Sequence, residues 1–228
     1  MLIAGLLIAS QALAFEPAVN KHGAEVSWDV MPVHWTYDDE GRPGEVAEDE
    51  ALGALREAFA SWNAVPGARV RFIEDDGTTP LDELNVVYWK PEWEWDADIL
   101  ALTSTWSQED GEITRFAIAI NGQADWATDG RKESMDLQNA LTHEVGHALG
   151  LGHDESHAEA TMAPTAGFGE TGKRKLHRSD EDGARYLYPD GSVPMGCASS
   201  PAPPSVLWAL ALGILAAFRS RHRSRKED

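Results

Sequence analysis

The chain has 228 residues, enough for one globular domain with a sizeable core and too few for a second once both ends are set aside. Its formal net charge of -19 disfavours nucleic acid and anionic membrane surfaces, so proteins, cations or basic substrates are the partners to expect, although solubility alone also explains such a charge. The single cysteine, Cys197, excludes an intramolecular disulfide. We expect a monomer.

The chain begins with an export pattern. Residues 1–14 are an apolar run that closes on Ala12-Leu13-Ala14, the small-residue pattern of a signal cleavage site. This pattern predicts a signal peptide over residues 1–14 and a mature chain that starts at Phe15. No positively charged segment precedes the run, and a buried N-terminal strand is the alternative interpretation.

The next segments predict a strand, a helix and four more strands. Apolar alternation indicates a strand over residues 30–37. A helix follows, which opens at acidic Glu48, places Phe59 and Trp62 on an apolar face and ends near Pro66. Apolar runs between turn residues predict the four strands at 70–73, 84–89, 99–106 and 113–120. We assign the four tryptophans of this region to core and surface packing: Trp89, Trp93, Trp95 and Trp106.

Two further helices are predicted. One covers residues 134–149, with apolar residues at steps of three and four. The other begins at Ser179, which forms a capping box with Asp182, and stops before Pro189. The fold class expected is α+β.

The helix over residues 134–149 contains the run His143-Glu144-Val145-Gly146-His147. Two histidines four residues apart lie one turn apart on one helix face, so both imidazoles reach one ion. Glu144 is turned about 100° from His143 around the axis, so it reaches a metal-bound water and leaves the metal itself to the histidines. Alone, this five-residue pattern also occurs in amphipathic helices that bind no zinc.

The residues after this helix supply more of the site. Gly150 can adopt the left-handed conformation that ends a helix and turns the chain back toward the metal. His153 then arrives as a third ligand, and three imidazoles leave a fourth position open for water, as in catalytic zinc sites. Further on, Met162 lies in the run Thr-Met-Ala-Pro, which places a methionine in a turn.

With these residues the chain resembles the metzincins and, within them, the matrixins, over about residues 30–189. The resemblance implies a zincin-like catalytic domain at residues 15–190: a twisted mixed five-stranded sheet with three helices and an active-site cleft between the sheet edge and the zinc helix. It also implies that Met162 forms an apolar floor under one catalytic zinc, and that residues 99–106 are an edge strand, with Ala101, Leu102 and Thr103 aligning a peptide substrate.

The function implied is that of a zinc metalloendopeptidase, in which Glu144 assists a zinc-bound water in hydrolysing peptide bonds. A zinc-binding surface protein with little or no turnover is the alternative. A purely structural zinc would need a fourth protein ligand, such as His157, and a gluzincin would need a third ligand other than His153. Calcium is a further possible cofactor, because many matrixins bind it and the loops are acidic.

The sequence departs from the animal matrixins in three places. It has no histidine between His34 and His143, which argues against their second, structural zinc. No cysteine precedes the zinc helix, so a cysteine-switch propeptide is not expected, and no tyrosine follows Met162 closely to line the pocket beside the metal. Two other histidines, His157 and His177, do not fall at the spacing of the zinc-binding motif and are interpreted as exposed loop residues.

The C-terminal end carries a second pattern that indicates export. Residues 191–204 are a Pro- and Ser-rich linker containing Cys197, residues 205–218 are a short apolar segment, and residues 219–228 are Arg-rich. The apolar segment falls short of the ~20 residues that a spanning helix normally needs. The order resembles the C-terminal sorting tails of myxobacterial-type surface proteins, which implies processing or lipidation at Cys197 and a membrane attachment that can be temporary. An ordinary tail anchor with an incidental cysteine is the alternative. We therefore expect an exported protein, either secreted or held at the cell surface.

Overall fold

The computed structural model describes residues 15–77 and 85–192. The predicted signal peptide, Cys197, the apolar segment 205–218 and the Arg-rich tail lie outside these residues. Within the described part, no helix is both long and apolar enough to cross a membrane.

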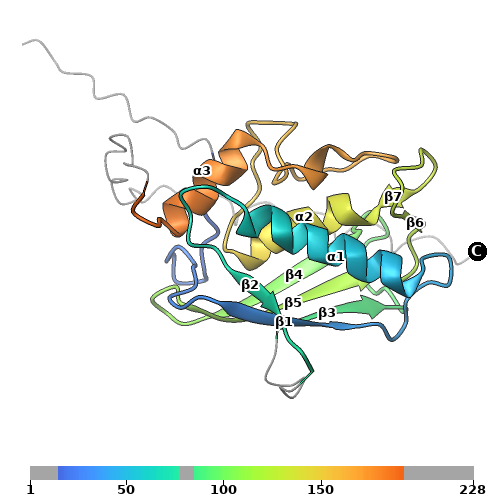
Figure 1. The fold of residues 1–228 in the computed structure, drawn as a ribbon, viewed down its shortest axis with the longest axis horizontal. Coiled ribbons are helices and arrows are strands. Elements are labelled where there is room, and N and C mark those ends of the chain that lie inside the picture. The colour runs from blue at the N-terminus through green and yellow to red at the C-terminus, as the bar shows by residue number, and fades with distance from the viewer. Residues whose placement is uncertain (1–14, 78–84, 193–228) are drawn as a thin grey trace, which may run out of the picture. The chain divides into compact units, whose positions relative to one another are not determined.

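A five-stranded sheet forms the lower layer of the molecule in Figure 1. Its strand order is β2-β1-β3-β5-β4, and every neighbouring pair is parallel except β4 and β5. The order leaves β4 at one edge of the sheet, next to an antiparallel partner. The strands are β1 (Val33–Asp38), β2 (Phe72–Glu74), β3 (Asn85–Lys90), β4 (Ala101–Ser107) and β5 (Ile113–Asn121).

Three α-helices accompany the sheet: α1 (Glu48–Asn63), α2 (Leu137–Ala148) and α3 (Arg178–Leu187). Figure 1 shows α1 and α2 side by side over one face of the sheet. The mixed five-stranded sheet and three α-helices confirm the fold class predicted from the sequence. Smaller elements are a short parallel pair, β6 (Trp126–Ala127) with β7 (Met135–Asp136), and a 3-10 helix, η2 (Gly172–Arg174).

The core lies between the helices and the sheet and is rich in aromatic rings. Phe59 of α1 stacks on Trp35 of β1 with ring centroids 4.2 Å apart. Trp62, one helical turn further along α1, is fully buried, and its Nε1 donates to the Thr142 carbonyl oxygen of α2 at 2.8 Å. This contact ties α1 directly to the helix that carries the histidine motif.

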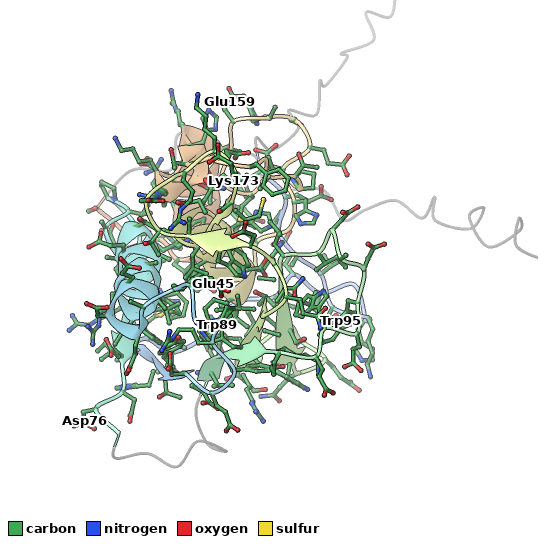
Figure 2. The ribbon with its side chains drawn as sticks, turned by 90° about the vertical axis from the view of Figure 1, so that its right-hand side faces the viewer. Glu45, Asp76, Trp89, Trp95, Glu159 and Lys173 are labelled. Carbon is green, nitrogen blue, oxygen red and sulfur yellow. The ribbon has the colours of Figure 1, made fainter. Side chains whose placement is uncertain are left out.

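Of the four tryptophans, Trp89 lies in the core, Trp93 is partly buried, and Trp95 and Trp106 are exposed. Trp89 is buried, and its Nε1 donates to the Tyr37 hydroxyl at 2.6 Å. Trp95 and Trp106 are 38% and 48% exposed. Figure 2 shows Trp89 toward the middle of the molecule and Trp95 at its edge.

Several predicted boundaries were wrong by a few residues. Helix α2 begins at Leu137 rather than at Ser134, because Met135 and Asp136 pair with β6 and the Asp136 carboxylate then caps the helix by accepting from Asn139 N at 2.9 Å. Helix α1 ends at Asn63, before Pro66. Strand β1 starts three residues later than predicted, strand β2 runs from 72 to 74, and strands β3, β4 and β5 end one residue further on.

The predicted capping box of the third helix was also wrong. The cap is His177, whose Nδ1 accepts from Ser179 N at 3.2 Å, while the Asp180 carboxylate accepts from His177 N at 2.7 Å. Histidine is an unusual residue at this position, where Ser, Thr, Asp and Asn are preferred. A search for the usual residue types therefore selects Ser179, two positions too late.

Candidate metal centre and catalytic site

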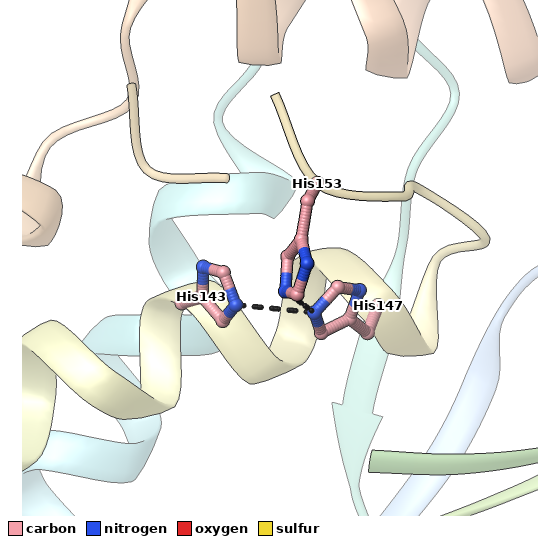
Figure 3. Close-up of side chains that lie close together, drawn as sticks. All are labelled: His143, His147 and His153. Carbon is pink, nitrogen blue, oxygen red and sulfur yellow. Dashed lines mark hydrogen bonds between the residues drawn. The ribbon is translucent and has the colours of Figure 1, made fainter. Parts of the chain in front are cut away.

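Helix α2 presents His143 and His147 on one face, one turn apart. Their Nε2 atoms are 3.1 Å apart. Figure 3 shows both imidazoles projecting from the helix toward a third ring, His153, which reaches them from the loop that follows.

Gly150 directs the chain back toward the helix. Its φ of +99° lies in the left-handed region, and a Cβ at this position would stand 2.2 Å from the Val26 carbonyl oxygen. Only glycine fits both conditions. His153 then places its Nε2 3.2 Å from that of His147.

Aromatic side chains satisfy the carbonyl groups at the end of α2. Trp28 Nε1 donates to Ala148 O at 2.8 Å, and the Tyr188 hydroxyl donates to Leu149 O at 2.5 Å. A helix leaves its last carbonyls without partners inside the helix, and here the core supplies them. The turn at Gly150 is therefore fixed from both sides.

The three imidazoles fit a zinc ion in spacing, and two of them, His143 and His147, fit it also in tautomer. A tetrahedral ion with bonds of about 2.0–2.1 Å places its ligand atoms about 3.3 Å apart, close to the two nitrogen separations seen here. Nδ1 of His143 donates to Thr161 O at 2.7 Å and Nδ1 of His147 donates to Leu151 O at 2.8 Å, so each Nε2 presents a lone pair to the common centre. Burial lowers the pKa of all three rings, which favours the neutral form that binds metal.

Glu144 lies beside the three imidazoles and is buried, with 7% of its surface exposed. Burial raises the pKa of its carboxyl group to about 7, and a hydrogen bond from Thr103 acts in the opposite direction. The Thr103 hydroxyl on β4 lies 2.6 Å from Glu144 Oε2 and 3.0 Å from the main-chain oxygen of the same residue. Helix α2 and the edge strand are thus in direct contact at the candidate site.

Met162 packs under α2. A Cβ built on Gly146 would come within 2.2 Å of Met162 Sδ, so the absence of a side chain at Gly146 makes room for the methionine. The Met162 side chain is buried, and the main-chain oxygen of the preceding Thr161 is the acceptor for His143 Nδ1. The methionine turn therefore both fills the space below the helix and orients a candidate ligand.

Asp180 fixes this turn, and the sequence analysis did not identify it. Its carboxylate is buried and accepts from Thr161 N at 2.8 Å and from Met162 N at 3.0 Å. The position of Asp180 three residues after the cap of α3 is the signal that would have found it, had His177 been recognised as the cap.

Lys173 is a second residue that the sequence analysis missed. It is 3% exposed, its Nζ donates to the Ala163 carbonyl oxygen, and burial lowers its pKa. Its positive charge also adds to the effect of burial in lowering the pKa of His143, His147 and His153. No sequence signal marked it, because a lysine in a turn is normally exposed.

The remaining predicted residues are distributed as follows. Ala101 and Leu102 pair with Ile120 and Ala119 of β5, next to Thr103 on the edge strand. Within residues 15–77 and 85–192, the three imidazoles are the only group of at least three metal-binding side chains whose ligand atoms lie within 4.8 Å of one another. Calcium binding stays a prediction.

The interpretation of His157 and His177 as exposed loop residues was wrong. Both are partly buried, and both are hydrogen-bonded to protein groups. Neither approaches the three imidazoles closely enough to join them as a fourth ligand.

The fold and the three converging imidazoles together define a zincin-like catalytic domain of the metzincin type. Residues 27–189 match the sequence model of the Matrixin family, which is most of the chain. This protein belongs to the matrixin family. Family membership and the histidine triad both support zinc binding.

Three curated relatives show how far the similarity extends. The chain is 26% identical over 159 residues to "Metalloendoproteinase 2-MMP" of Arabidopsis thaliana, covering 64% of this chain and 39% of the relative. It is 27% identical over 158 residues to "Matrix metalloproteinase-19" of Homo sapiens, covering 68% of this chain and 29% of the relative. A shorter match of 61 residues to human "Matrilysin" is 43% identical and covers 27% of this chain and 22% of the relative. The chain thus spans less than half the length of these relatives.

Proposed function

We propose that this protein is a zinc-dependent endopeptidase that hydrolyses protein or peptide substrates outside the cell. The observation that carries the proposal is the meeting of three converging imidazoles with a buried carboxylate that contacts the edge strand β4. Matrixin family membership supports it. The names of the relatives, metalloendoproteinase and matrix metalloproteinase, agree with it.

His143, His147 and His153 hold the metal through their Nε2 atoms, and three protein ligands leave one position open. Zinc bound there supplies a Lewis acid that makes a water molecule more acidic and polarises a carbonyl group. Glu144 is the general base: its carboxylate accepts the proton from the attacking water and then returns it to the leaving amine. A pKa of about 7 places this carboxyl group near the range in which one group performs both steps.

The edge strand binds the substrate main chain. One side of β4 pairs with β5, and among residues 15–77 and 85–192 no strand pairs with its other side. Its free N–H and C=O groups around Ala101, Leu102 and Thr103 pair with an extended peptide whatever its side chains. Because Thr103 also contacts Glu144, a peptide bound along this strand lies beside the general base.

Export and surface attachment belong to the same proposal and rest on sequence alone. Residues 1–14 direct the chain out of the cell, residues 15–190 are the catalytic domain, and residues 191–204 link it to an apolar segment at 205–218. Processing or lipidation at Cys197, together with the Arg-rich residues 219–228, sets whether the catalytic domain stays at the membrane or is released.

The test compares the wild-type chain with Glu144→Ala on a mixed peptide library read by mass spectrometry, with zinc content measured on the same samples. The variant should keep zinc at the three imidazoles and lose at least the 10²–10⁴-fold that a general base contributes. Glu155→Ala is the matched control, because Glu155 is an exposed carboxylate just after His153. It should cleave as the wild type does.

Two outcomes would contradict the proposal. If Glu144→Ala still cleaves at the wild-type rate, Glu144 is not the base. If the wild-type protein is fully loaded with zinc and cleaves no peptide in the library, the zinc-binding protein with little turnover becomes the better description.

A further inference from the structure

Two imidazoles outside the triad face each other at the start of α3. His157 comes from the loop after His153, and His177 precedes α3. Their ring centroids are 5.1 Å apart with an interplanar angle of 37°. The three pairs of rings in the triad have centroid separations of 4.7, 5.2 and 4.8 Å, so the two rings of this second pair lie as close to each other as the rings of the triad do.

A buried carboxylate orients His157. Nδ1 of His157 lies 2.9 Å from Asp154 Oδ2, and only 4% of the Asp154 side chain is exposed. The same carboxylate accepts from the main-chain N of Ser156 at 2.9 Å, which holds it in place. A histidine whose Nδ1 proton is donated to a carboxylate presents its Nε2 lone pair outward, and this is the arrangement usual for metal-binding histidines.

His177 is oriented from α3. Its Nδ1 lies 2.8 Å from Ser179 Oγ and 3.2 Å from Ser179 N. In one tautomer Nδ1 accepts from the main-chain N, while in the other it donates to the hydroxyl oxygen and leaves Nε2 free to bind an ion. The second tautomer keeps the shorter of the two contacts and gives up the bond from Ser179 N that caps α3, so binding of an ion at Nε2 weakens this cap.

A third ligand is within reach of this pair. Glu159 Oε1 lies 3.9 Å from His177 Nε2, and 71% of the Glu159 side chain is exposed, so it can rotate at little cost. Figure 2 shows Glu159 at the outer rim of the molecule. In the observed rotamer this carboxylate does not yet meet both imidazoles, and a small turn of an exposed side chain is the movement required.

We propose that His157 and His177, completed by Glu159, form a second binding site for a divalent transition-metal ion, separate from the triad. Two imidazoles and one carboxylate select zinc and its neighbours in the first transition series over calcium and magnesium, which prefer oxygen ligands. The remaining position is open to water, and the partly exposed rings make this ion exchangeable. The catalytic proposal neither requires nor implies this site.

An ion at this position would connect two parts of the molecule that support the triad. The loop between His153 and His157 is held on one side because Asp154 N donates to Met162 O at 2.9 Å. On the other side, an ion shared by His157 and His177 fastens the same loop to the start of α3. Binding of the second ion therefore stabilises the folded state as its free concentration rises above its dissociation constant.

The test measures zinc stoichiometry on the full-length protein after removal of metal. Equilibrium dialysis against Zn²⁺ with elemental analysis should give two equivalents for the wild type. His157→Gln and His177→Gln should each weaken the second equivalent by more than the 10–100-fold that loss of an outer hydrogen-bond partner costs. The double variant His143→Gln with His147→Gln should lose only the other equivalent. His22→Gln, at an exposed histidine elsewhere, is the control and should keep both.

Folding is checked on every variant by circular dichroism without metal, because His177 also caps α3. Glu159→Gln leaves the cap intact and should also weaken the second equivalent, which keeps the proposal testable if His177→Gln unfolds. A wild-type stoichiometry of one, or a second equivalent that survives in both His157→Gln and Glu159→Gln, would overturn the proposal. If instead the triad variant alone keeps its full zinc content, the catalytic proposal is the one that fails.

Discussion

The two groups of imidazoles in the described chain are held in different ways. In the triad, Nδ1 of His143 and Nδ1 of His147 donate to main-chain carbonyl oxygens. In the pair formed by His157 and His177, Nδ1 of His157 contacts the Asp154 carboxylate, and Nδ1 of His177 contacts both the hydroxyl and the main-chain N of Ser179. Main-chain acceptors are fixed by the fold, whereas side-chain acceptors can exchange tautomers and rotamers. The triad is therefore ready for a metal as folded, while the pair must adjust to receive one.

The groups also differ in their surroundings. His143 is 9% exposed and packs above the methionine turn, whereas the pair is partly exposed and has an exposed carboxylate, Glu159, as its neighbour. A buried site excludes water and orients its ligands, at the cost of needing every polar group satisfied. A partly exposed site tolerates substitution of its neighbours more easily. Substitutions near each group should therefore have separable effects.

The largest effect is expected for Asp180→Ala, which acts on both groups. The Asp180 carboxylate accepts from Thr161 N, Met162 N and His177 N, and the substitution leaves these donors without it. Buried donors without partners cost about 1–3 kcal/mol each, so the free energy of unfolding should fall by about 3 kcal/mol or more in urea titrations. Asp182→Ala, at an exposed carboxylate of the same helix, should change it by less than about 1 kcal/mol. A fall for Asp180→Ala no larger than this control would refute the assignment.

Gly146→Ala should affect the triad and leave the pair intact. The added Cβ would stand 2.2 Å from Met162 Sδ and 2.8 Å from Trp62 Cζ2, so these side chains or α2 must shift. Overpacking of this kind costs about 1–3 kcal/mol, and peptide hydrolysis should fall with it. Gly53→Ala is the matched control: nothing lies within 4 Å of a Cβ there, so the same change in α1 should raise stability by about 0.5–1 kcal/mol. Equal effects of the two substitutions on thermal unfolding would contradict the prediction.

Asp154→Asn should affect the pair and spare the triad. The amide is close in shape to the carboxylate but accepts more weakly from His157 Nδ1. Loss of such an outer partner weakens metal affinity by about 10–100-fold, so only the second zinc equivalent should become weaker in dialysis. Ser156→Ala, which keeps its main-chain N–H, should change neither equivalent. If the substitution weakens zinc binding at the triad alone, Asp154 orients His153 and not His157.

The smallest effect is expected for Thr103→Val. Glu144 must be ionised to accept a proton, so activity falls as the pH drops through its pKa. The Thr103 hydrogen bond lowers that pKa against the effect of burial, and its removal should move the acid limb of the pH–activity profile upward. One hydrogen bond is worth about 0.5–1.5 kcal/mol, so the shift should not exceed about one unit. Thr105→Val, at an exposed threonine of the same strand, should leave the profile unchanged, and a downward shift in Thr103→Val would contradict the prediction.

The sequence predicted the parts of the site that depend on local spacing. His143 and His147 are four residues apart on one helix, and a glycine before His153 indicated the turn. The order of strands and helices was also predicted, because apolar period and turn residues are local signals. The edge position of β4 came from the family resemblance, since no local pattern specifies which strand is outermost.

The rest depends on contacts between residues far apart in the sequence. Thr103 meets Glu144 because β4 lies beside α2, and no pattern around residue 103 indicates that contact. Asp180 and Lys173 look like ordinary surface charges in the sequence, yet both are buried beside the methionine turn. His157 and His177 were interpreted separately for the same reason. Tertiary structure brings them together.

The turn at Gly150 also connects the triad to the first residues of the domain. Ala18 N donates to Gly150 O at 2.8 Å, and Gly152 N donates to Glu16 O at 2.7 Å. The segment just before His153 is therefore paired with residues near the start of the domain, which are synthesised long before it. Contacts that span so much sequence form only when most of the chain has been synthesised and has collapsed. A nascent chain therefore carries the histidine motif before it has the geometry, and the three imidazoles converge only after residues 16–18 have paired with residues 150–152.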